Sequence, residues 1–308
     1  MQTLKDQLTK VLGKTVTFAE KMYKHTTIKI GGSADILVLA DDVDTIIKTM
    51  KLAREKNLDV SIIGNGSNLI VSDQGIRGIV IKVYSSEQKP IVDGQKVDVF
   101  SGFPLGKLIN FTIQEGLGGL EGLVGIPGSF GGALTMNAGT GTTEIGHMIN
   151  WVKVINKKTL EVETIPKEEM GFSYRKSIIQ NGCHVILEAQ LQLMRGSSRD
   201  LKTIKNEIIK KRNKKQPVQF PNSGSIFKNP PNDSAGRLIE ATGLKGYTIG
   251  DAQISEQHAN FIVNIGQAKA SEVVELMNVA RKEVNKKFNL VLQPEVKFMG
   301  GGLKLEEV

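Results

Sequence analysis

Two glycine-bearing stretches carry the residue spacing with the clearest chemical meaning in this chain. The first, residues 64–69, reads Gly-Asn-Gly-Ser-Asn-Leu and directly follows an apolar run that ends at Ile63. A strand that ends in Gly-x-Gly and small polar residues can turn several backbone N–H groups toward one phosphate. The third glycine of the dinucleotide fingerprint is missing, and residues 70–72 continue as a strand rather than as a helix. A plain turn explains the same residues equally well.

The second stretch, residues 115–141, is both glycine-rich and apolar. Its glycine content argues against a helix, and the leucine, valine, isoleucine and phenylalanine residues between the glycines indicate that it is buried. A buried segment must satisfy its backbone polar groups, and a bound polyanionic cofactor would accept from many N–H groups at once. Tight turns packed against a core are the alternative. The glycines are Gly116, Gly118, Gly119, Gly122, Gly125, Gly128, Gly131, Gly132, Gly139 and Gly141.

The composition is typical of a globular protein of one or two domains. The chain has 308 residues, of which 40% are hydrophobic and 23% charged. No apolar run approaches the ~20 residues that span a bilayer, and residues 1–15 show no apolar signal-peptide core. We therefore expect a cytoplasmic location and no membrane partner. The single cysteine, Cys183, excludes an internal disulfide, and the histidines lack metal-ligand spacing, so we expect no metal site.

The net charge of +8 fits either nucleic acid or a phosphate-bearing small molecule as partner. Much of the excess lies in residues 199–215, where Leu201, Ile204 and Ile208 recur at helical spacing. We interpret this segment as a solvated basic helix. Aromatic residues make up only 5% of the chain and none interrupts the tract, which argues against a stacking platform for single-stranded nucleic acid. No nucleic-acid partner is expected.

Strands and helices alternate around the two glycine-bearing stretches. Strands are expected at 35–39 and 59–63, joined by a helix from Val43 to Ala53 that Asp41 or Asp42 caps. This βαβ unit implies parallel strands with a right-handed crossover. Further strands are expected at 78–83, 97–100, 151–155, 162–165 and 185–194, with a helix opened by Phe103-Pro104.

The C-terminal part reads as a second, smaller α/β domain. Residues 217–221, Pro-Val-Gln-Phe-Pro, indicate an extended linker, so we place the domain boundary between 216 and 217. Ser234 is expected to cap a short helix that ends at Thr242-Gly243. A strand at 260–264, a longer helix through 273–284 and a last strand at 290–298 complete the prediction.

Six segments, in matching order and spacing, resemble UDP-N-acetylenolpyruvoylglucosamine reductases of the shorter subtype. The resemblance covers the chain from about Thr27 to Gly301. It implies an α+β (α/β) fold, in which residues 1–216 form a PCMH-type FAD-binding domain of two α/β subdomains, divided near residues 75–85. Residues 217–308 would form a C-terminal α/β substrate-binding domain. The segments are GNGSNLIVSD (64–73), LEGLVGIPGSFGGALTMNAG (120–139), GFSYR (171–175), SGSIFKNP (223–230), AQISEQHANFIVN (252–264) and LQPEVKFMG (292–300).

The resemblance also implies an activity, namely that of an FAD enzyme of peptidoglycan (cell wall) synthesis. In the family, NADPH reduces a non-covalently bound flavin, which passes hydride to the enolpyruvyl group of a UDP-sugar to give UDP-N-acetylmuramate. Arg175 matches the residue that polarises the substrate carboxylate, Ser225 the proton donor, and Glu295 the catalytic glutamate. Read without the resemblance, these three residues fit a surface salt bridge, a turn serine and an edge-strand carboxylate.

Further site residues follow from the same match. Tyr174, Lys228 and Asn229 are expected to line the substrate pocket or contact the diphosphate. The expected partners are the UDP-sugar and NADPH, and the expected oligomeric state is a monomer. The residues expected to hold FAD are Gly64, Asn65, Gly66, Ser67, Asn68, Leu69, Ile126, Pro127, Gly128, Ser129, Gly132, Ala133, Asn137 and Gly139.

Two other functions remain compatible with the residues. One is an FAD-dependent oxidase of the same fold that acts on an alcohol or a lactone. Such relatives often tether the flavin through histidine or cysteine, whereas Cys183 and the histidines here lie outside the glycine-rich motifs. The other is a non-enzymatic module that binds an anionic partner through the basic helix, with an affinity that falls steeply with salt.

Overall fold

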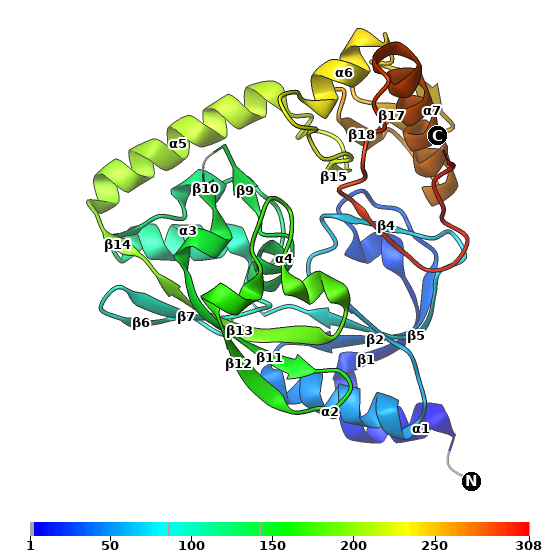
Figure 1. Cartoon of the computed structure of the whole chain (residues 1–308). Coiled ribbons are helices and arrows are strands. Elements are labelled where there is room, and N and C mark those ends of the chain that lie inside the picture. Colours follow the sequence, from blue (N-terminus) through cyan, green and yellow to red (C-terminus); the bar gives the residue numbers. More distant parts are fainter. Residues whose placement is uncertain (1–2, 86, 142, 308) are drawn as a thin grey trace. The chain divides into compact units, whose positions relative to one another are not determined.

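A computed structural model describes residues 3–85, 87–141 and 143–307 (Figure 1). The chain divides into two compact units. Unit 1 comprises Met1–Thr17, Ile36–Asn65 and Gly78–Lys211, and unit 2 comprises Phe18–Asp35, Gly66–Arg77 and Arg212–Val308. None of the described helices is long and apolar enough to cross a membrane.

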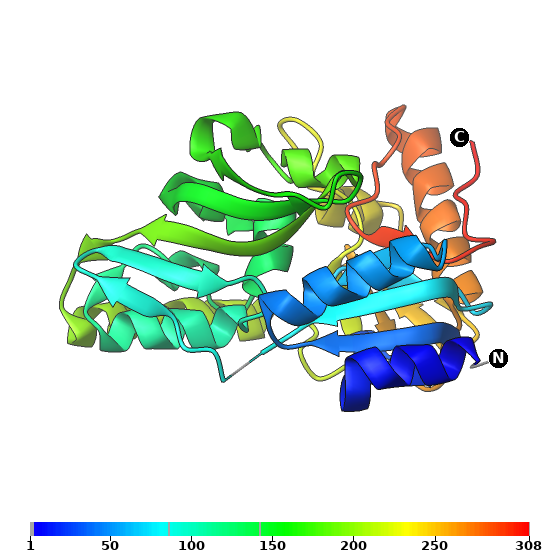
Figure 2. The ribbon, with the colours of Figure 1, turned by 90° about the horizontal axis from the view of Figure 1, so that it is seen from below.

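Unit 1 contains most of the expected strands. Its largest sheet has five strands in the order β12-β11-β13-β7-β6, and every neighbouring pair is antiparallel (Figure 2). The elements are α1 (Leu4–Leu12), η1 (Gly13–Thr15), α2 (Val43–Glu55), β3 (Val60–Ile63), β6 (Ile91–Asp93), β7 (Lys96–Phe100), α3 (Leu105–Gln114), β8 (Leu117–Gly118), η3 (Glu121–Leu123), α4 (Phe130–Thr135), β9 (Gly139–Thr140), β10 (Thr143–Glu144), η4 (Ile145–Met148), β11 (Ile149–Asn156), β12 (Val162–Pro166), η5 (Lys167–Met170), η6 (Ile178–Asn181), β13 (His184–Gln192) and β14 (Met194–Arg195).

Four elements cross from one unit to the other: β1 (Val16–Lys21), β2 (Ser33–Ala40), β5 (Ile76–Val83) and α5 (Ser198–Lys215). The predicted βαβ unit is confirmed as β2, α2 and β3, and Asp42 caps α2 by accepting the Thr45 N–H at 2.6 Å. Within the sheet β1-β2-β5-β3, however, β2 and β3 are not neighbours, because β5 lies between them and pairs in parallel with β3. The basic helix is confirmed as α5, although Ile204 is exposed rather than packed.

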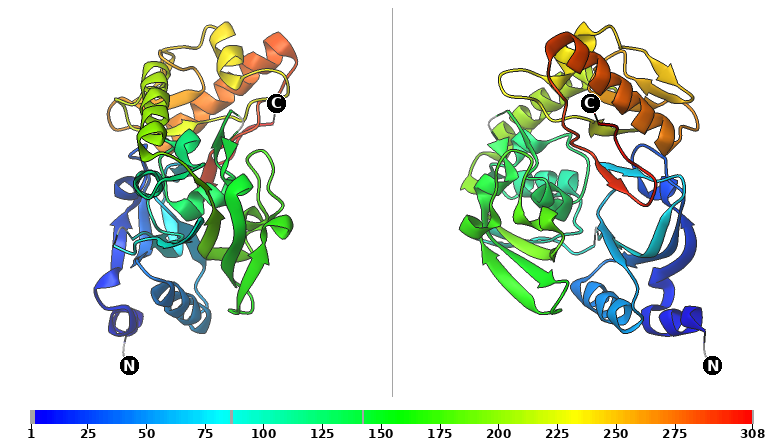
Figure 3. Two further views of the ribbon diagram at one scale, coloured as in Figure 1. Left: turned by 90° about the vertical axis from the view of Figure 1, so that its left-hand side faces the viewer. Right: turned by 45° about the vertical axis from the view of Figure 1, so that its right-hand side comes forward.

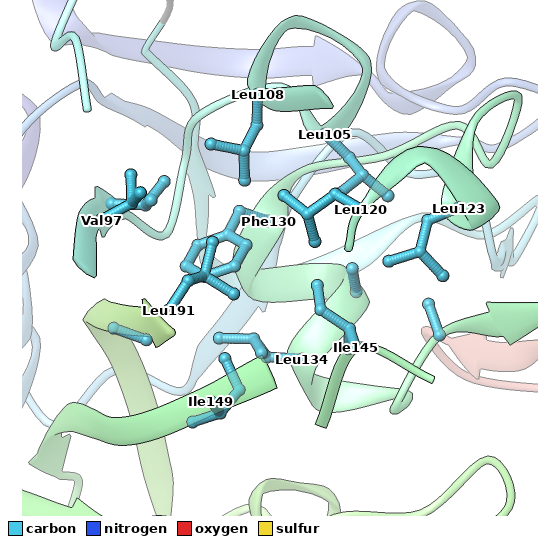
Figure 4. Close-up of a cluster of buried hydrophobic side chains, with 14 of the residues drawn as sticks. Val97, Leu105, Leu108, Leu120, Leu123, Phe130, Leu134, Ile145, Ile149 and Leu191 are labelled. Atoms are coloured by element: carbon cyan, nitrogen blue, oxygen red, sulfur yellow. The ribbon is translucent and has the colours of Figure 1, made fainter. Parts of the chain in front are cut away.

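The glycine-rich stretch is buried in unit 1, as predicted. Phe130 and Leu134 lie within a hydrophobic cluster that includes Leu105, Leu108 and Leu191 (Figure 4). Burial of these apolar side chains, at about 25 cal/mol per Å² removed from water, holds the stretch against α3 and the five-stranded sheet.

The expectation of no helix in this stretch is wrong, since α4 forms over Phe130–Thr135. Ser129 caps it by accepting the Gly132 N–H at 3.3 Å. A Cβ at Gly131 would lie 2.8 Å from the Ser101 Cβ. Glycine is therefore tolerated in this helix because close packing outweighs its low helix propensity.

Unit 2 joins two early segments to the C-terminal part of the chain. Asn264 Nδ2 donates to the Ile28 carbonyl at 3.1 Å, and the Asp73 carboxylate accepts the Ala270 and Ser271 N–H groups at 2.8 and 3.0 Å. The sheet order is β15-β18-β17-β16, and Figure 3 shows α7 beside it. The elements are η2 (Met22–His25), β4 (Leu69–Val71), β15 (Asn222–Ser225), α6 (Ala235–Ala241), β16 (Thr248–Ile249), β17 (Ala252–Ile254), β18 (Phe261–Asn264), α7 (Ala270–Phe288) and β19 (Lys297–Met299).

The Ser234 cap is confirmed, because its side chain accepts the Arg237 N–H at 3.2 Å. Two other predictions for unit 2 are wrong. Residues 217–221 contain a turn rather than an extended linker, with the Phe220 N–H bonded to the Pro217 carbonyl. The last strand is only β19, which pairs in parallel with β4. Before β19 the segment makes only an isolated bridge, between Pro294 and Phe227, and Pro294 has no N–H to donate to a ladder.

Candidate active site

In unit 1 the start of the first glycine-bearing stretch lies against the second stretch. A Cβ on Gly64 would overlap the Ser129 hydroxyl, so the backbone that leaves β3 lies directly against the start of α4. The Leu105 N–H in turn bonds to the Gly128 carbonyl at 3.0 Å. No described residue supplies an acceptor for the backbone N–H groups of Gly64 and Asn65. Such a cradle of available donors fits the pyrophosphate of FAD.

Some of the remaining residues predicted to hold FAD are already used in packing or in helix hydrogen bonds. Ile126 packs against the core of unit 1, and the Ala133 N–H is used inside α4. Gly128 has a φ of +138°, a value that favours glycine. Gly139 opens the short strand β9. Pro127 lies in the loop between η3 and α4.

Asn137 is buried and its side chain is fully engaged by protein groups. Its Nδ2 donates to Glu144 Oε2 at 2.7 Å and to the Ser173 carbonyl at 3.0 Å, while its Oδ1 accepts the Gly146 N–H at 3.0 Å. With φ at +42° it also occupies a backbone region that asparagine tolerates better than most residues. Its side chain therefore holds this loop against Ser173 and Gly146.

Arg175 lies in a tight turn of unit 1 with a backbone φ of +55°. Its guanidinium donates from Nη2 to the Gly139 carbonyl at 3.1 Å and stands 5.0 Å from the centre of the Tyr174 ring. Tyr174 itself is 46% exposed. A left-handed conformation costs a non-glycine residue about 1–2 kcal/mol, and such strain concentrates at functional sites. The geometry agrees with a role for this arginine beyond a surface salt bridge.

Gln180 is a residue of this region that sequence reasoning missed. Its Nε2 donates to the Arg175 carbonyl at 3.0 Å and to the Thr135 carbonyl at 2.9 Å. Gln180 lies five residues after the end of the GFSYR segment and belongs to no recognisable motif. No sequence signal could have found it, since its contact with Thr135 spans 45 residues.

In unit 2 the structure places Ser225 and Glu295 on paired segments. The Glu295 N–H bonds to the carbonyl of Ile226, the residue after Ser225, at 2.8 Å. The Lys228 N–H bonds to the Gln293 carbonyl at 2.9 Å, which extends the same pairing. Both predicted catalytic residues of unit 2 are thus held by main-chain hydrogen bonds. Arg175 belongs to unit 1.

Residues 66–69 of the first glycine-bearing loop also belong to unit 2. Gly66 has a φ of +65°, and a Cβ there would overlap the His25 carbonyl. Asn68 Nδ2 donates to the Glu295 carbonyl at 3.1 Å. Leu69 starts β4, and Ser67 precedes it in the loop. This loop therefore helps to fix the backbone on which Glu295 stands.

Two lysines give unit 2 a local positive charge. Desolvation lowers the pKa of Lys297, and the nearby charge of Lys228 lowers it further. Asn229 has a structural contact, since its Oδ1 accepts the Ala235 N–H at 3.0 Å at the start of α6.

Asn260 is a second residue that sequence reasoning did not assign. It is buried, its Oδ1 accepts the Phe227 N–H at 3.0 Å, and its Nδ2 donates to the Phe227 carbonyl at 2.8 Å. This reciprocal pair fixes the segment between Ser225 and Lys228. Within the described residues, no group of three or more His, Cys, Asp or Glu side chains is placed to hold a metal ion.

Comparison with known proteins agrees with this arrangement. The family model described as "UDP-N-acetylenolpyruvoylglucosamine reductase, C-terminal domain" matches residues 216–299, and the model "FAD binding domain" matches residues 34–164. A protein of Caldanaerobacter subterraneus subsp. tengcongensis, named UDP-N-acetylenolpyruvoylglucosamine reductase, is 39% identical over 300 residues, which are 97% of this chain and 99% of the relative. The chain belongs to the UDP-N-acetylenolpyruvoylglucosamine reductase family.

Other members of the reductase family match over similar lengths. The second reductase of Symbiobacterium thermophilum is 42% identical over 282 residues, 92% of this chain and 91% of the relative. The crystal structure of the reductase from Thermus caldophilus superposes with a TM-score of 0.78 at 34% identity and covers 91% of this chain and 98% of that one. The predicted family, the α+β fold and the FAD-dependent oxidoreductase class are confirmed. The oxidase and the non-enzymatic module are set aside.

Proposed function

We propose that Arg175, Ser225 and Glu295 perform the reaction of this reductase. The chain is an FAD-dependent enzyme of peptidoglycan synthesis that uses NADPH to reduce UDP-N-acetylglucosamine-enolpyruvate to UDP-N-acetylmuramate. The observation that supports the residue assignment best is the pairing of Glu295 with Ile226, which places two of the three residues on neighbouring backbone segments of unit 2.

The reaction adds hydride to C3 of the enolpyruvyl group and a proton to C2. When bound, the flavin supplies the hydride. Negative charge then moves through C2 onto the carboxylate, which needs a cation beside it. Arg175 suits this role because a guanidinium stays charged and can bind both carboxylate oxygens. Its backbone is anchored by the Gln180 side chain, so the side chain starts from a fixed position.

Ser225 donates the proton to C2 in this proposal. A serine hydroxyl is a very weak acid, so it can act only toward a strongly basic carbanion. Glu295, as the protonated acid, stabilises the enolate-like intermediate. Both residues lie on segments that main-chain hydrogen bonds hold in register, which suits groups that must meet a single carbon atom.

The other predicted site residues bind the two substrates and the cofactor. The backbone of residues 64–69 holds the pyrophosphate of FAD, and residues 126–139 surround the flavin and its ribityl chain. Lys228 and Asn229 contact the diphosphate of the UDP-sugar or NADPH, with Lys297 adding charge beside Lys228. Tyr174 lines the substrate pocket.

The assignment of one function to each domain is a prediction. Residues 1–216 bind FAD, in two subdomains that meet near residues 75–85, and residues 217–308 bind the UDP-sugar. A monomer in the cytoplasm is the expected form.

The two half-reactions, followed separately by stopped-flow absorbance of the flavin, test the assignment of Ser225. Ser225→Ala should leave flavin reduction by NADPH at wild-type speed and slow flavin reoxidation by the enolpyruvyl substrate about 10²-fold or more, the usual contribution of a general acid. Wild-type reoxidation in this variant would refute the proton-donor role.

Ser223→Ala is the matched control. Ser223 lies on the same strand, β15, and its hydroxyl is buried without a hydrogen-bond partner among the described residues. Its removal should leave both half-reactions within about twofold of wild type, since no hydrogen bond is lost. Equal damage from the two variants would mean that β15 is perturbed, and the assignment of Ser225 would lose its support.

A further inference from the structure

The turn that carries Arg175 has an unusual backbone. The Ser173 N–H bonds to the Lys176 carbonyl at 3.2 Å, and the Lys176 N–H bonds back to the Ser173 carbonyl at 2.9 Å. Tyr174 and Arg175 are the two residues between them, and Arg175 has a φ of +55°. A positive φ at the third position of such a turn ordinarily calls for glycine. An arginine in that position needs support from outside the turn.

Gln180 provides that support through a single nitrogen. Its Nε2 carries two hydrogens and donates to two carbonyls, those of Arg175 at 3.0 Å and of Thr135 at 2.9 Å. Thr135 is the last residue of α4, so the bridge connects the arginine turn to the glycine-rich stretch of the same unit. A glutamate at 180 would place a third negatively polarised oxygen against two carbonyls, and an apolar residue would leave them without this donor.

Two further contacts connect the same turn to the same stretch. Asn137 Nδ2 donates to the Ser173 carbonyl at 3.0 Å, and Arg175 Nη2 donates to the Gly139 carbonyl at 3.1 Å. The backbone of the turn is thus held at both ends by side-chain amides. The left-handed backbone of Arg175 sets the direction of its Cα–Cβ bond, and thereby the direction in which the guanidinium points. In an ordinary right-handed or extended conformation the side chain would point elsewhere.

We propose that Gln180 is a positioning residue of the reductase, which aims the Arg175 guanidinium at the substrate carboxylate by holding the Arg175 peptide in its left-handed conformation. The inference rests on the proposed role of Arg175. Gln180 touches neither substrate nor flavin in this proposal and acts only through the arginine.

Gln180→Met keeps the length of the side chain and removes both donors. Flavin reduction by NADPH should stay within about twofold of wild type, whereas reoxidation by the enolpyruvyl substrate should slow about tenfold, as expected for the loss of one to two hydrogen bonds that matter in only one half-reaction. The affinity for UDP-N-acetylmuramate, which carries the carboxylate, should also fall about tenfold in calorimetry. Equal slowing of both half-reactions would overturn the proposal.

Ser177→Ala is the control for a purely structural effect. Ser177 Oγ donates to the same Thr135 carbonyl at 2.7 Å, whereas the Arg175 carbonyl accepts from Gln180. This variant should lose stability without slowing reoxidation. If it slows reoxidation as much as Gln180→Met does, the bridge to Arg175 is not the cause and the proposal fails. Should Gln180→Met not retain FAD, Gln180→Asn replaces it, because its shorter amide cannot reach both carbonyls.

A double-mutant cycle with Arg175→Met separates this inference from the proposed function. In the Arg175→Met background, Gln180→Met should add nothing to the defect in reoxidation, because Gln180 acts only through the arginine. A further tenfold loss there would overturn the inference. If Arg175→Met slows reoxidation and Gln180→Met does not, the inference alone fails. If Arg175→Met itself is harmless, the proposed role of Arg175 fails first and Gln180 has nothing to position.

Discussion

The arginine turn of unit 1 and the Ser225–Glu295 region of unit 2 are held in place in opposite ways. In unit 1, Arg175 sits in a left-handed conformation that the side chain of Gln180 supports. In unit 2, main-chain hydrogen bonds from Glu295 to Ile226 and from Lys228 to Gln293 hold the backbone. A backbone that is held by main-chain hydrogen bonds keeps its place when a side chain is changed. A backbone that is held by one side-chain amide loses that support when the amide is replaced.

The two regions also differ in how closely the backbone meets its neighbour. Gly64 meets the Ser129 hydroxyl without room for a Cβ, whereas the Glu295 segment is joined to Ile226 by a main-chain hydrogen bond. A small change at Gly64 should therefore be more damaging than a side-chain change in the Glu295 segment. Three tests, from the largest expected effect to the smallest, can break or sharpen this difference.

Gly64→Ala should have the largest effect. The added methyl group overlaps the Ser129 hydroxyl, so either β3 or the start of α4 must move, at a cost of about 1–3 kcal/mol. The protein should be purified with much less FAD, as measured by the ratio of flavin to protein absorbance. Adding Ser129→Gly removes the hydroxyl and should restore part of the flavin content. A single variant that retains full flavin would show that the close approach is not required.

Acid should weaken unit 2 by way of His258. Its Nδ1 accepts the Asn260 N–H at 3.2 Å, and Asn260 holds Phe227. Burial lowers the pKa of His258 below the ordinary value of 6.5, with Lys245 and Lys215 adding to the effect, while a hydrogen bond to its own backbone and the charge of Glu240 oppose it. The unfolded chain then binds the proton first, so the free energy of unfolding should fall as the pH drops below about 6.5.

Denaturant titrations between pH 8 and pH 5 measure this slope. His258→Asn, which offers an acceptor that does not titrate, should flatten it, whereas an unchanged slope would exclude His258 as the source.

Gln293→Ala should have the smallest effect. The Gln293 side chain is exposed, and only its carbonyl takes part in the pairing with Lys228. Both half-reactions should stay within about twofold of wild type, in contrast to Gln180→Met. A loss as large as that of the Gln180 variant would mean that side chains also position unit 2, and the distinction between the units would disappear.

Much of the fold could be predicted from local patterns. The periodicity from Val43 to Ala53 and the caps offered by Asp41 and Asp42 identified α2, and Ser234 identified the start of α6. Two predictions, the absence of a helix in the glycine-rich stretch and the long last strand, failed for physical reasons. α4 contains two glycines because Ser101 and Ser129 lie close to its backbone. Of the strand expected at 290–298 only β19 forms, because Pro294 has no N–H to donate to a ladder.

The sequence by itself determined the family, the cofactor and the approximate path of the chain, because glycine spacing, hydrophobic periodicity and six ordered motifs are all local properties. Only the tertiary structure revealed that Gly64 lies against Ser129, that Gln180 supports Arg175, and that Asn260 fixes Phe227. The reason is physical: each of these contacts joins residues whose local sequence specifies a conformation but no partner. The partner is decided by how the buried elements of each unit pack.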